Sequence, residues 1–513
     1  MSDWVLLVEI TGYTDATTAV VYRYSTGPYS TLPTDTPANA WYSERVLDPG
    51  SITRTVPTER NSPRAEVGYG VIRLVNIDGA LDATFGSGSV SFRERLARVL
   101  RVRPGAAYST AEVLLVATIA QIELSDEEVT ISVKDPSYRL ASAHITSTYG
   151  GTNSLPNGVD GVDDLRGKVK PALYGRALKI RPPMVNTSRL IYQISTRALQ
   201  SVDGVYDGGA PYSAGAAYSS EADMQANAPS AGQYRAWLAG GMIRLGSSPA
   251  LGLTVDASAD SAANSTPAQL LRRMALDRGV VSGDINAADV TALDTASSAV
   301  CGLWIDDSRT TLDAMDLIAR SCGAVYWFDR LGALRMRQLS LPGAAEAVAV
   351  APWSAQSVTQ VMSGEDVPTE RVRIKYARYG VTQGASEVAG SVTAADEADL
   401  AQEWRVAEYA AAPSPNPHAR LLTVERDTAL TTKAAADAEA LRLHGLLAAP
   451  RRTHRAVGVQ LSDALVLALD LMAVVELRWR RYGFDPVTGS PRRVVGMTTY
   501  LRDLRADLTL WGA

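Results

Sequence analysis

The sequence predicts a mainly β chain of several domains, with one α+β unit inserted among them. Three observations support this prediction. The 513 residues exceed one ordinary domain, and a composition of 46% apolar and 20% charged residues suffices for several cores. Strand-length runs rich in β-branched and aromatic residues, punctuated by Gly, Pro, Asn and Asp, fill the first ~140 residues and return later. Between 264 and 340, capped helical patterns replace them.

The N-terminal segment, residues 1–146, is expected to form a β-rich, barrel-like domain, with strands such as "WVLLVEITGY" and "EVTISVKD". Within it, "SFRERLARVLRVRPG" fits either a short helix or a basic strand. Residues 147–168 are rich in Gly, Asp and Asn and are expected to be a linker loop. A second β-rich domain is expected over 169–260, because its Gly-rich and Tyr-rich spacing suits the short strands of a small barrel.

Residues 261–342 predict an α+β domain with the order αβαββ. Thr266 is expected to cap its first helix, with Pro267 at the first helical position and Gln269 completing a capping box. A second helix covers "TTLDAMDLIARSCG" and ends at Gly323. The stretch "AVYWFDRLGALRMRQL" predicts a hairpin whose turn includes "DRLG".

The C-terminal segment, 343–513, is expected to be a barrel-like β domain with an insertion at 384–417 and one Ala-rich helix, "TTKAAADAEALRLHGLL". It contains the strand "RVRIKY", whose alternation gives two different faces. The apolar face carries Val372, Ile374 and Tyr376, and the cationic face carries Arg371, Arg373 and Lys375.

The cationic face could contact nucleic acid, an acidic protein surface or water. Basic residues interleaved with tyrosines can bind single strands, but a solvated strand face has the same pattern. A net charge of −5 and a pI of about 5.6 argue against a dedicated DNA-binding protein. We interpret the face as a protein contact or a solvated surface. On this hypothesis, reversing all three charges impairs assembly and leaves DNA affinity unchanged.

The sequence contains no recognisable catalytic or metal-binding pattern. The four histidines lie outside HExxH, HxH and Cys/His clusters, so each is expected to be a surface or capping residue, with His444 near a helix C-terminus. They are His144, His418, His444 and His454. No GxSxG motif is present, and "NGVDGVDDLRGK" fails the EF-hand pattern at positions 3, 5 and 12. We therefore predict no catalytic, cofactor-binding or metal-binding residues, no cofactor, and a protein that is not an enzyme.

Two cysteines, Cys301 and Cys322, are too few for a disulfide framework or a structural zinc site, so both are expected to be buried thiols in a reducing compartment. The start "MSDWVLLVEITG" lacks the basic region of a signal peptide. The most apolar stretch, 464–477, carries two acids and is shorter than the ~20 residues of a spanning helix. We expect synthesis in the cytoplasm and no membrane segment in this chain.

Several stretches together carry a resemblance over nearly the full chain. They are "WYSERVLDPGSITRTV" and "GYGVIRLVNIDGALD", "KVKPALYGRALKIRPP", "IYQIS" and "VDGVYDGG", "LIARSCGAVYWFDRLGALRMRQL", and "RVRIKYARYGVTQ", "AEALRL", "RRYGFD" and "LTLWG". In this order and spacing the chain resembles the baseplate hub or tail-tip proteins of long-tailed bacteriophages and prophages. No single stretch is diagnostic.

The resemblance implies a structural virion protein at the distal end of a phage tail, built from small β-barrels with an inserted α+β domain. It implies a homotrimer whose ring adapts the six-fold distal tail protein to three-fold tip or fibre proteins. Such a ring encloses a channel for the tape measure protein and then, transiently, DNA. Two alternatives stay open: a tail-associated cell-wall hydrolase, which a peptidoglycan zymogram would detect, and a receptor- or carbohydrate-binding tail-tip protein, which a host-cell binding assay would detect.

Overall fold

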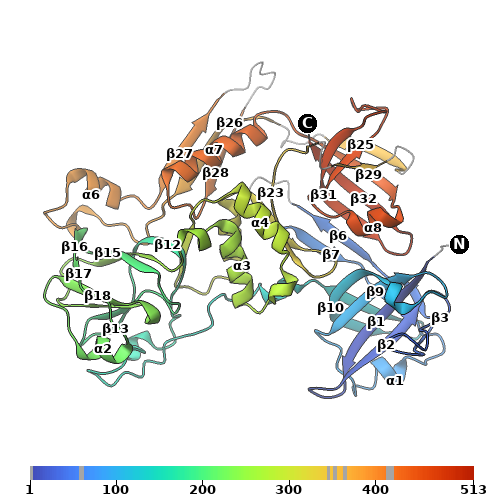
Figure 1. Ribbon diagram of the computed structural model, residues 1–513, viewed down its shortest axis with the longest axis horizontal. Coiled ribbons are helices and arrows are strands. Elements are labelled where there is room, and N and C mark those ends of the chain that lie inside the picture. The colour runs from blue at the N-terminus through green and yellow to red at the C-terminus, as the bar shows by residue number, and fades with distance from the viewer. Residues whose placement is uncertain are drawn as a thin grey trace.

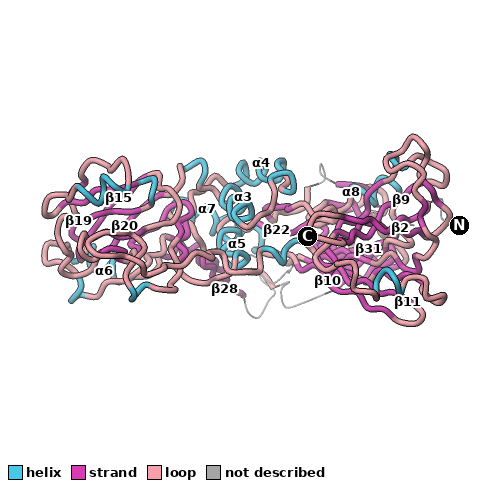
Figure 2. Tube along the Cα trace, turned by 90° about the horizontal axis from the view of Figure 1, so that it is seen from below, coloured by secondary structure: helices cyan, strands magenta, loops and turns pink. Residues whose placement is uncertain are grey.

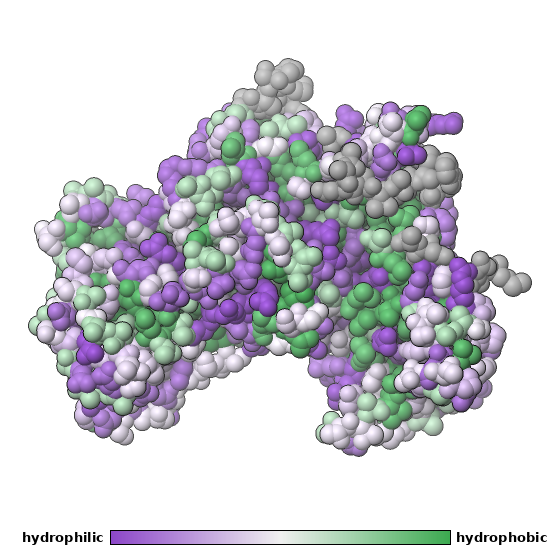
Figure 3. Space-filling view, in the orientation of Figure 1, coloured by the Kyte–Doolittle hydropathy of each residue, from purple (hydrophilic) through white to green (hydrophobic). Residues whose placement is uncertain are grey.

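The computed structural model describes residues 4–56, 63–343, 347–350, 355–361, 367–411 and 421–512. It is an elongated molecule with a β-rich lobe at each end and helices α3 (Pro267–Asp277) and α4 (Ala287–Ala296) between them (Figure 1). Figure 2, seen from below, gives the same order. Figure 3 shows that the lower edge is hollowed between the two lobes. The prediction of a mainly β, multi-sheet chain with an α+β unit is confirmed.

The N-terminal sheet has seven strands and curls into a half-barrel. In pairing order they are β2 (Ala19–Ser25), β1 (Val5–Tyr13), β9 (Leu96–Val102), β10 (Glu112–Leu124), β11 (Glu128–Lys134), β8 (Ile72–Val75) and β5 (Val46–Asp48). The segment before β5 also bonds the outer edge of β2, because Ser25 N donates to Ser43 O at 2.8 Å and Ser43 N donates to Arg23 O at 3.1 Å. The ambiguous stretch "SFRERLARVLRVRPG" contains β9 and is therefore a strand. Short elements on this lobe are β3 (Tyr29–Ser30), β4 (Trp41–Tyr42) and α1 (Asp82–Phe85).

The C-terminal sheet of the same lobe includes strands from both ends of the chain. Its main path is β24 (Ala347–Val350), β30 (Val474–Leu477), β31 (Ser490–Tyr500), β32 (Arg505–Gly512), β29 (Arg452–Gln460) and β25 (Ser357–Val361). The hairpin of β6 (Ser51–Thr55) and β7 (Glu66–Tyr69) joins it, with β6 antiparallel to β31. This hairpin falls within the expected N-terminal domain by sequence, but its strand pairing is with the C-terminal sheet. The short helix α8 (Asp463–Ala468) follows β29.

The lobe at the other end contains two five-stranded sheets. The first is β16 (Ala210–Pro211), β15 (Ser201–Asp207), β20 (Leu253–Ser258), β12 (Ala172–Ile180) and β21 (Gly302–Ile305). The second is β13 (Met184–Asn186), β14 (Ile191–Gln193), β19 (Met242–Leu245), β18 (Gln233–Trp237) and β17 (Ser213–Ala214), with helix α2 (Glu221–Ala226) beside it. Strand β21 comes from the expected α+β segment and pairs with β12, so the two units share a sheet.

The α+β unit contains α3, α4, α5 (Thr311–Arg320) and the hairpin β22 (Ala324–Phe328) and β23 (Leu334–Gln338). Helix α4 was not predicted. Thr266 caps α3 as expected, but the side chain of Gln269 donates to Asp294 of α4 at 2.5 Å, so the predicted capping box is wrong. A complete capping box instead starts α5, between Thr310 and Asp313. The predicted hairpin turn is confirmed, because Gly332 N donates to Asp329 O at 3.0 Å.

A separate three-stranded sheet, ordered β27 (Arg405–Ala410), β26 (Thr369–Tyr376) and β28 (Leu422–Asp427), packs against the Ala-rich helix α7 (Lys433–Leu447). The expected insertion, 384–417, supplies β27 and the helix α6 (Ala394–Leu400), and its last part, with the "PSPNP" stretch, lies outside the described residues. The insertion is therefore part of the sheet rather than an appended loop.

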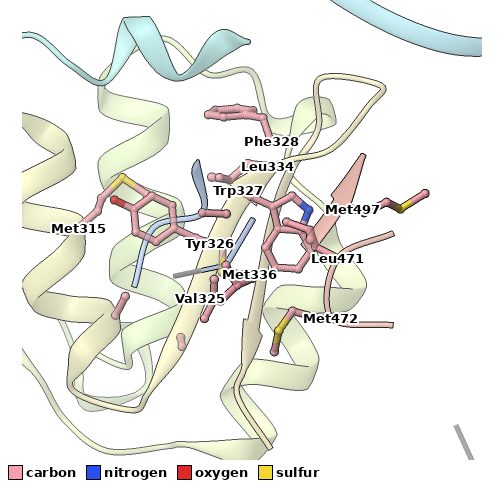
Figure 4. Packing of buried hydrophobic residues seen from close by; sticks show 14 of the residues in the cluster. Met315, Val325, Tyr326, Trp327, Phe328, Leu334, Met336, Leu471, Met472 and Met497 are labelled. Atoms are coloured by element: carbon pink, nitrogen blue, oxygen red, sulfur yellow. The ribbon is translucent and has the colours of Figure 1, made fainter. Parts of the chain in front are cut away.

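One apolar core runs through the N-terminal half-barrel, the helices, the α7 sheet and the C-terminal sheet, whereas the lobe of residues 172–258 has its own core. Figure 4 shows where the helical unit meets the C-terminal sheet: Tyr326 and Trp327 of β22 lie among Met315 of α5, Met472 and Met497. All five side chains are at most 3% exposed. Among the described helices, none has the length and apolarity that a bilayer crossing requires.

Candidate functional site

The cationic face of β26 is matched by carboxylates on its two neighbouring strands. The register places Arg373 opposite Glu408 of β27 and Glu425 of β28, on the face away from α7. The pairs are Arg371–Glu408 at 3.5 Å, Arg373–Glu408 at 3.3 Å, Arg373–Glu425 at 3.2 Å, Lys375–Glu425 at 2.7 Å and Lys375–Asp427 at 3.2 Å. The apolar face is buried, as predicted, with Val372 and Ile374 both 0% exposed. The partners of these cations are therefore strands of the same chain.

Mutual hydrogen bonding shifts the titration of this face. The carboxylate of Glu425 raises the pKa of Lys375, and the ammonium of Lys375 lowers the pKa of Glu425. The three cations face three carboxylates, so the stripe has no excess positive charge. A surface of this kind attracts phosphates much less than its sequence suggests.

His144 lies at the junction between the two lobes, in a buried chain of hydrogen bonds. Its Nδ1 lies 3.0 Å from Thr311 Oγ1 at the start of α5, and its Nε2 lies 2.7 Å from the hydroxyl of Tyr174 on β12. That hydroxyl donates to Asp277 at the end of α3, at 2.7 Å. The expectation of a surface or capping role for His144 is wrong, because the residue is only 4% exposed.

A buried ion cluster joins the helical unit to the C-terminal sheet. The guanidinium of Arg335 on β23 forks onto Asp289 of α4 at 2.5 and 3.1 Å and lies 3.6 Å from Asp329. Nearby, Arg54 of β6 is paired with Asp470, 416 positions away, and its side chain is 1% exposed. Removing one partner of a buried pair leaves an uncompensated charge, so these pairs hold the units in one arrangement.

Backbone contact also fixes the junction, because β12 and β21 approach closely at two glycines. Gly175 of β12 has a φ of +63° and lies against the carbonyl oxygen of Cys301. A Cβ on Gly302 would overlap the carbonyl of Arg176. Only glycine permits both the left-handed backbone and this separation.

A cavity of about 220 Å³ lies beside this strand pair, lined among others by Trp304, Asp306 and Asp307. The adjacent carboxylates differ: hydrogen bonding from Arg309 lowers the pKa of Asp307, whereas burial raises the pKa of Asp306. Arg309 donates to Asp307 at 2.7 and 2.8 Å, so one member of this adjacent pair is already held in an ion pair within the chain.

The remaining candidates occupy structural positions. His444 is near the end of α7, where its Nε2 lies 3.0 Å from Ala411 O. His454 is fully buried in the C-terminal sheet, so the expected surface role is wrong for His454. His418 lies outside the described residues. Cys301 and Cys322 are free and buried, as predicted. Within the described ranges, no group of three or more His, Cys, Asp or Glu residues could hold a metal ion.

No protein-family model matches the sequence, and no curated protein matches it either. Several solved structures are similar to this chain. The chain is similar to a 43 kDa tail protein of prophage MuSo2 from Shewanella oneidensis, with 11% identity, 98% of each chain covered and a TM-score of 0.39. It is similar to a tail protein from Neisseria meningitidis MC58, with 10% identity, 91% of this chain and 95% of that one covered, and a TM-score of 0.38.

A third similar structure is the prophage tail protein gp18 from Listeria monocytogenes EGD-e, with 8% identity, 100% of this chain and 95% of that one covered, and a TM-score of 0.34. All three of these structures are described as tail proteins, two of them from prophages.

Proposed function

We propose that this chain is a structural baseplate hub protein at the distal end of a phage tail. In this role three copies form a ring that adapts the six-fold tail tube and distal tail protein to three-fold tip or fibre proteins. The proposal extends the sequence resemblance. The observation that supports it best is the placement of a β-rich lobe at each end of the chain, so that three chains can present six lobes in one ring (Figure 1).

Such a ring requires a fixed distance between the lobes of each chain. Three features of the region between the lobes suit this requirement: the close β12–β21 pairing, the buried His144 chain, and the buried ion cluster between the helical unit and the C-terminal sheet. Each joins segments far apart in sequence, and each loses hydrogen bonds or leaves a buried charge if the lobes move.

The charge distribution suits a passage for DNA. A lumen that bound phosphates tightly would retain the genome, and binding of this kind scales with the number of unpaired cations. The chain is acidic overall, and its most cationic strand is neutralised by its neighbours. Tape measure protein and DNA would pass such a wall without being held by it.

The first test is the native mass of the purified protein at micromolar concentration, combined with negative-stain imaging. The expected result is three times the 54.7 kDa chain mass and a ring with three-fold symmetry. A stable dimer or tetramer would contradict the proposal. If the purified protein is a monomer, the deciding experiment is to assemble tails that lack it. Tails that still carry fibres and inject DNA would exclude a hub role.

The two alternatives are tested on the same preparation. Clearing of peptidoglycan in a zymogram would favour a cell-wall hydrolase, and saturable binding of the isolated protein to intact host cells would favour a receptor-binding tip protein. Neither result is expected for a hub.

A further inference from the structure

One end of the C-terminal sheet brings two arginines and a histidine together on one face. Strand β29 carries Arg452 and His454, which share a face because they are two positions apart. Arg452 lies opposite Gly512 of β32. The side chain of Arg492 on β31 extends over this glycine, since a Cβ added to Gly512 would lie 3.1 Å from Arg492 Cδ. The missing side chain at Gly512 therefore leaves room for Arg492 beside Arg452.

Phe484, from the turn between β30 and β31, packs against the two buried members of this cluster. The guanidinium of Arg492 lies 4.7 Å from the centroid of the Phe484 ring, and the centroid of the His454 ring lies 4.7 Å from the same ring. Arg492 is 8% exposed and His454 is 0% exposed, whereas Arg452 is exposed. The cluster thus extends from a solvent-exposed arginine to a fully buried histidine.

The buried polar atoms of this cluster have no partners among the described residues. Arg492 Nη1 donates to Pro491 O at 2.9 Å, but Arg492 Nε is buried without a hydrogen-bond partner. Both ring nitrogens of His454 are also buried and without a partner. A buried polar group costs stability unless a ligand or a water molecule bonds to it. Three such atoms in one cluster indicate a place for a ligand.

The charges of the cluster indicate which kind of ligand it suits. Burial, Arg492 and Arg452 all lower the pKa of His454, to about 4, and burial and Arg452 lower the pKa of Arg492. The two arginines and the histidine therefore act on one another, and among the described residues no carboxylate is a cause of either shift. Arg480 and Arg481, both exposed in the adjacent turn, add to the positive potential at this end of the sheet. An anion would offset all of these charges.

We propose that Arg452, Arg492 and His454 form a binding site for a small oxyanion, which is a phosphate group or a carboxylate. A guanidinium presents Nε and one Nη as a planar fork that matches two oxygens of such a group, and Arg492 Nε is the unused donor of this fork. Neutral His454 keeps one N–H donor, and Arg452 adds a positive charge on the solvent side. Phe484 lies against Arg492, so an entering anion displaces the turn that carries Phe484.

The site suits a single group rather than a nucleic-acid backbone, because two of its three side chains are at most 8% exposed. It is therefore compatible with a passage that does not retain DNA. The site belongs to the C-terminal sheet and does not depend on the proposed tail role, so its test does not decide that role.

The test follows the phosphorus NMR line of inorganic phosphate, which broadens when the ion exchanges onto the full-length protein. We expect saturable binding at neutral pH and constant ionic strength, with a dissociation constant of roughly 1 mM or below. Acetate is the second probe. Displacement of phosphate by equal concentrations of acetate would assign the site to carboxylates, and phosphate that acetate does not displace would assign it to phosphate groups.

Arg492→Gln should weaken phosphate binding by about ten-fold or more, because it removes the fork and one charge. Arg452→Gln changes an exposed side chain, which keeps the fold intact, and should weaken binding several-fold. Arg455→Gln is the matched control, because Arg455 is exposed on the same strand but on its opposite face, and it should leave the affinity unchanged.

Three results would overturn the site. The first is the absence of saturable binding up to about 10 mM phosphate. The second is wild-type affinity in both Arg492→Gln and Arg452→Gln. The third is a loss in Arg455→Gln as large as in Arg492→Gln, which would indicate non-specific attraction to the surface.

Discussion

The guanidinium of Arg373 lies 3.2 Å from the carboxylate of Glu425, across the parallel pair of β26 and β28. On its other side it lies 3.3 Å from Glu408 of β27. Arg373, which in the sequence is part of a possible binding surface, is thus the middle residue in a row of ion pairs within one sheet. About 40% of each of these three side chains is exposed, so the pairs are screened and individually weak.

We predict that Arg373→Glu lowers the free energy of unfolding by about 1 kcal/mol, because it places like charges opposite each other on adjacent strands. Arg455→Glu is the control, because this exposed strand arginine lies opposite Thr359 and Thr509 and has no ion pair in the described structure, so its effect should be smaller. Urea denaturation measures both. An unchanged stability for Arg373→Glu would show that the row contributes nothing.

The sequence predicted half of this arrangement. Alternation along "RVRIKY" identified the buried and charged faces correctly because strand periodicity is local. Glu408 could not be recognised as a partner, because it falls in a stretch read as an insertion, and Glu425 lies some fifty positions from Arg373. Which strands become neighbours depends on the packing of the whole unit. The effect of reversing all three cations on tail assembly stays a prediction.

The junction was harder to foresee. His144, Tyr174 and Asp277 have no sequence motif in common, and they meet because the hydroxyl of Tyr174 on β12 contacts both the segment before β12 and the end of α3. A His in a strand-to-loop segment is usually exposed, so a surface role was the natural expectation for His144. Residues such as Gly302 gave a weak signal, since a glycine inside a strand pattern often marks a close backbone approach.

Gly302→Ala should destabilise the protein by about 3 kcal/mol, because the new Cβ overlaps the β12 backbone, which cannot move without breaking the strand pair. Gly445→Ala is the matched control. Gly445 lies in α7, and a Cβ added there would have nothing within 4 Å, so alanine should stabilise by up to about 1 kcal/mol. Urea midpoints measure both. Equal effects of the two substitutions would contradict the close approach of β12 and β21.

His454 should make the C-terminal sheet sensitive to acid. Its ring is fully buried against Phe484, with centroids 4.7 Å apart, and burial lowers its pKa to about 4. Between pH 6.5 and 4 the unfolded chain binds a proton that the folded chain does not. Stability is therefore complete above pH 6.5 and falls as the pH drops, by about 3 kcal/mol at pH 4 for this residue.

His454→Leu should reduce this slope, because leucine has no group that titrates. Neither ring nitrogen of His454 has a hydrogen-bond partner within the described residues, so the substitution leaves no polar group unpaired. Urea midpoints at pH 7.5, 6, 5 and 4.5 measure the effect. A wild-type protein whose midpoint is flat over this range would contradict the assignment to His454.

The two thiols should be unreactive in the folded protein. Cys301 and Cys322 are 0% and 1% exposed, and burial raises the pKa of Cys301 to about 12 and that of Cys322 as well. Since the thiolate is the reactive form, Ellman's reagent at pH 8 should modify neither thiol in buffer and both in 6 M guanidinium, roughly two equivalents per chain. Ser87→Cys, in an exposed loop, should add one fast equivalent. Rapid reaction of a native thiol would mean that the core around β21 opens readily, which would also weaken the case for a fixed distance between the lobes.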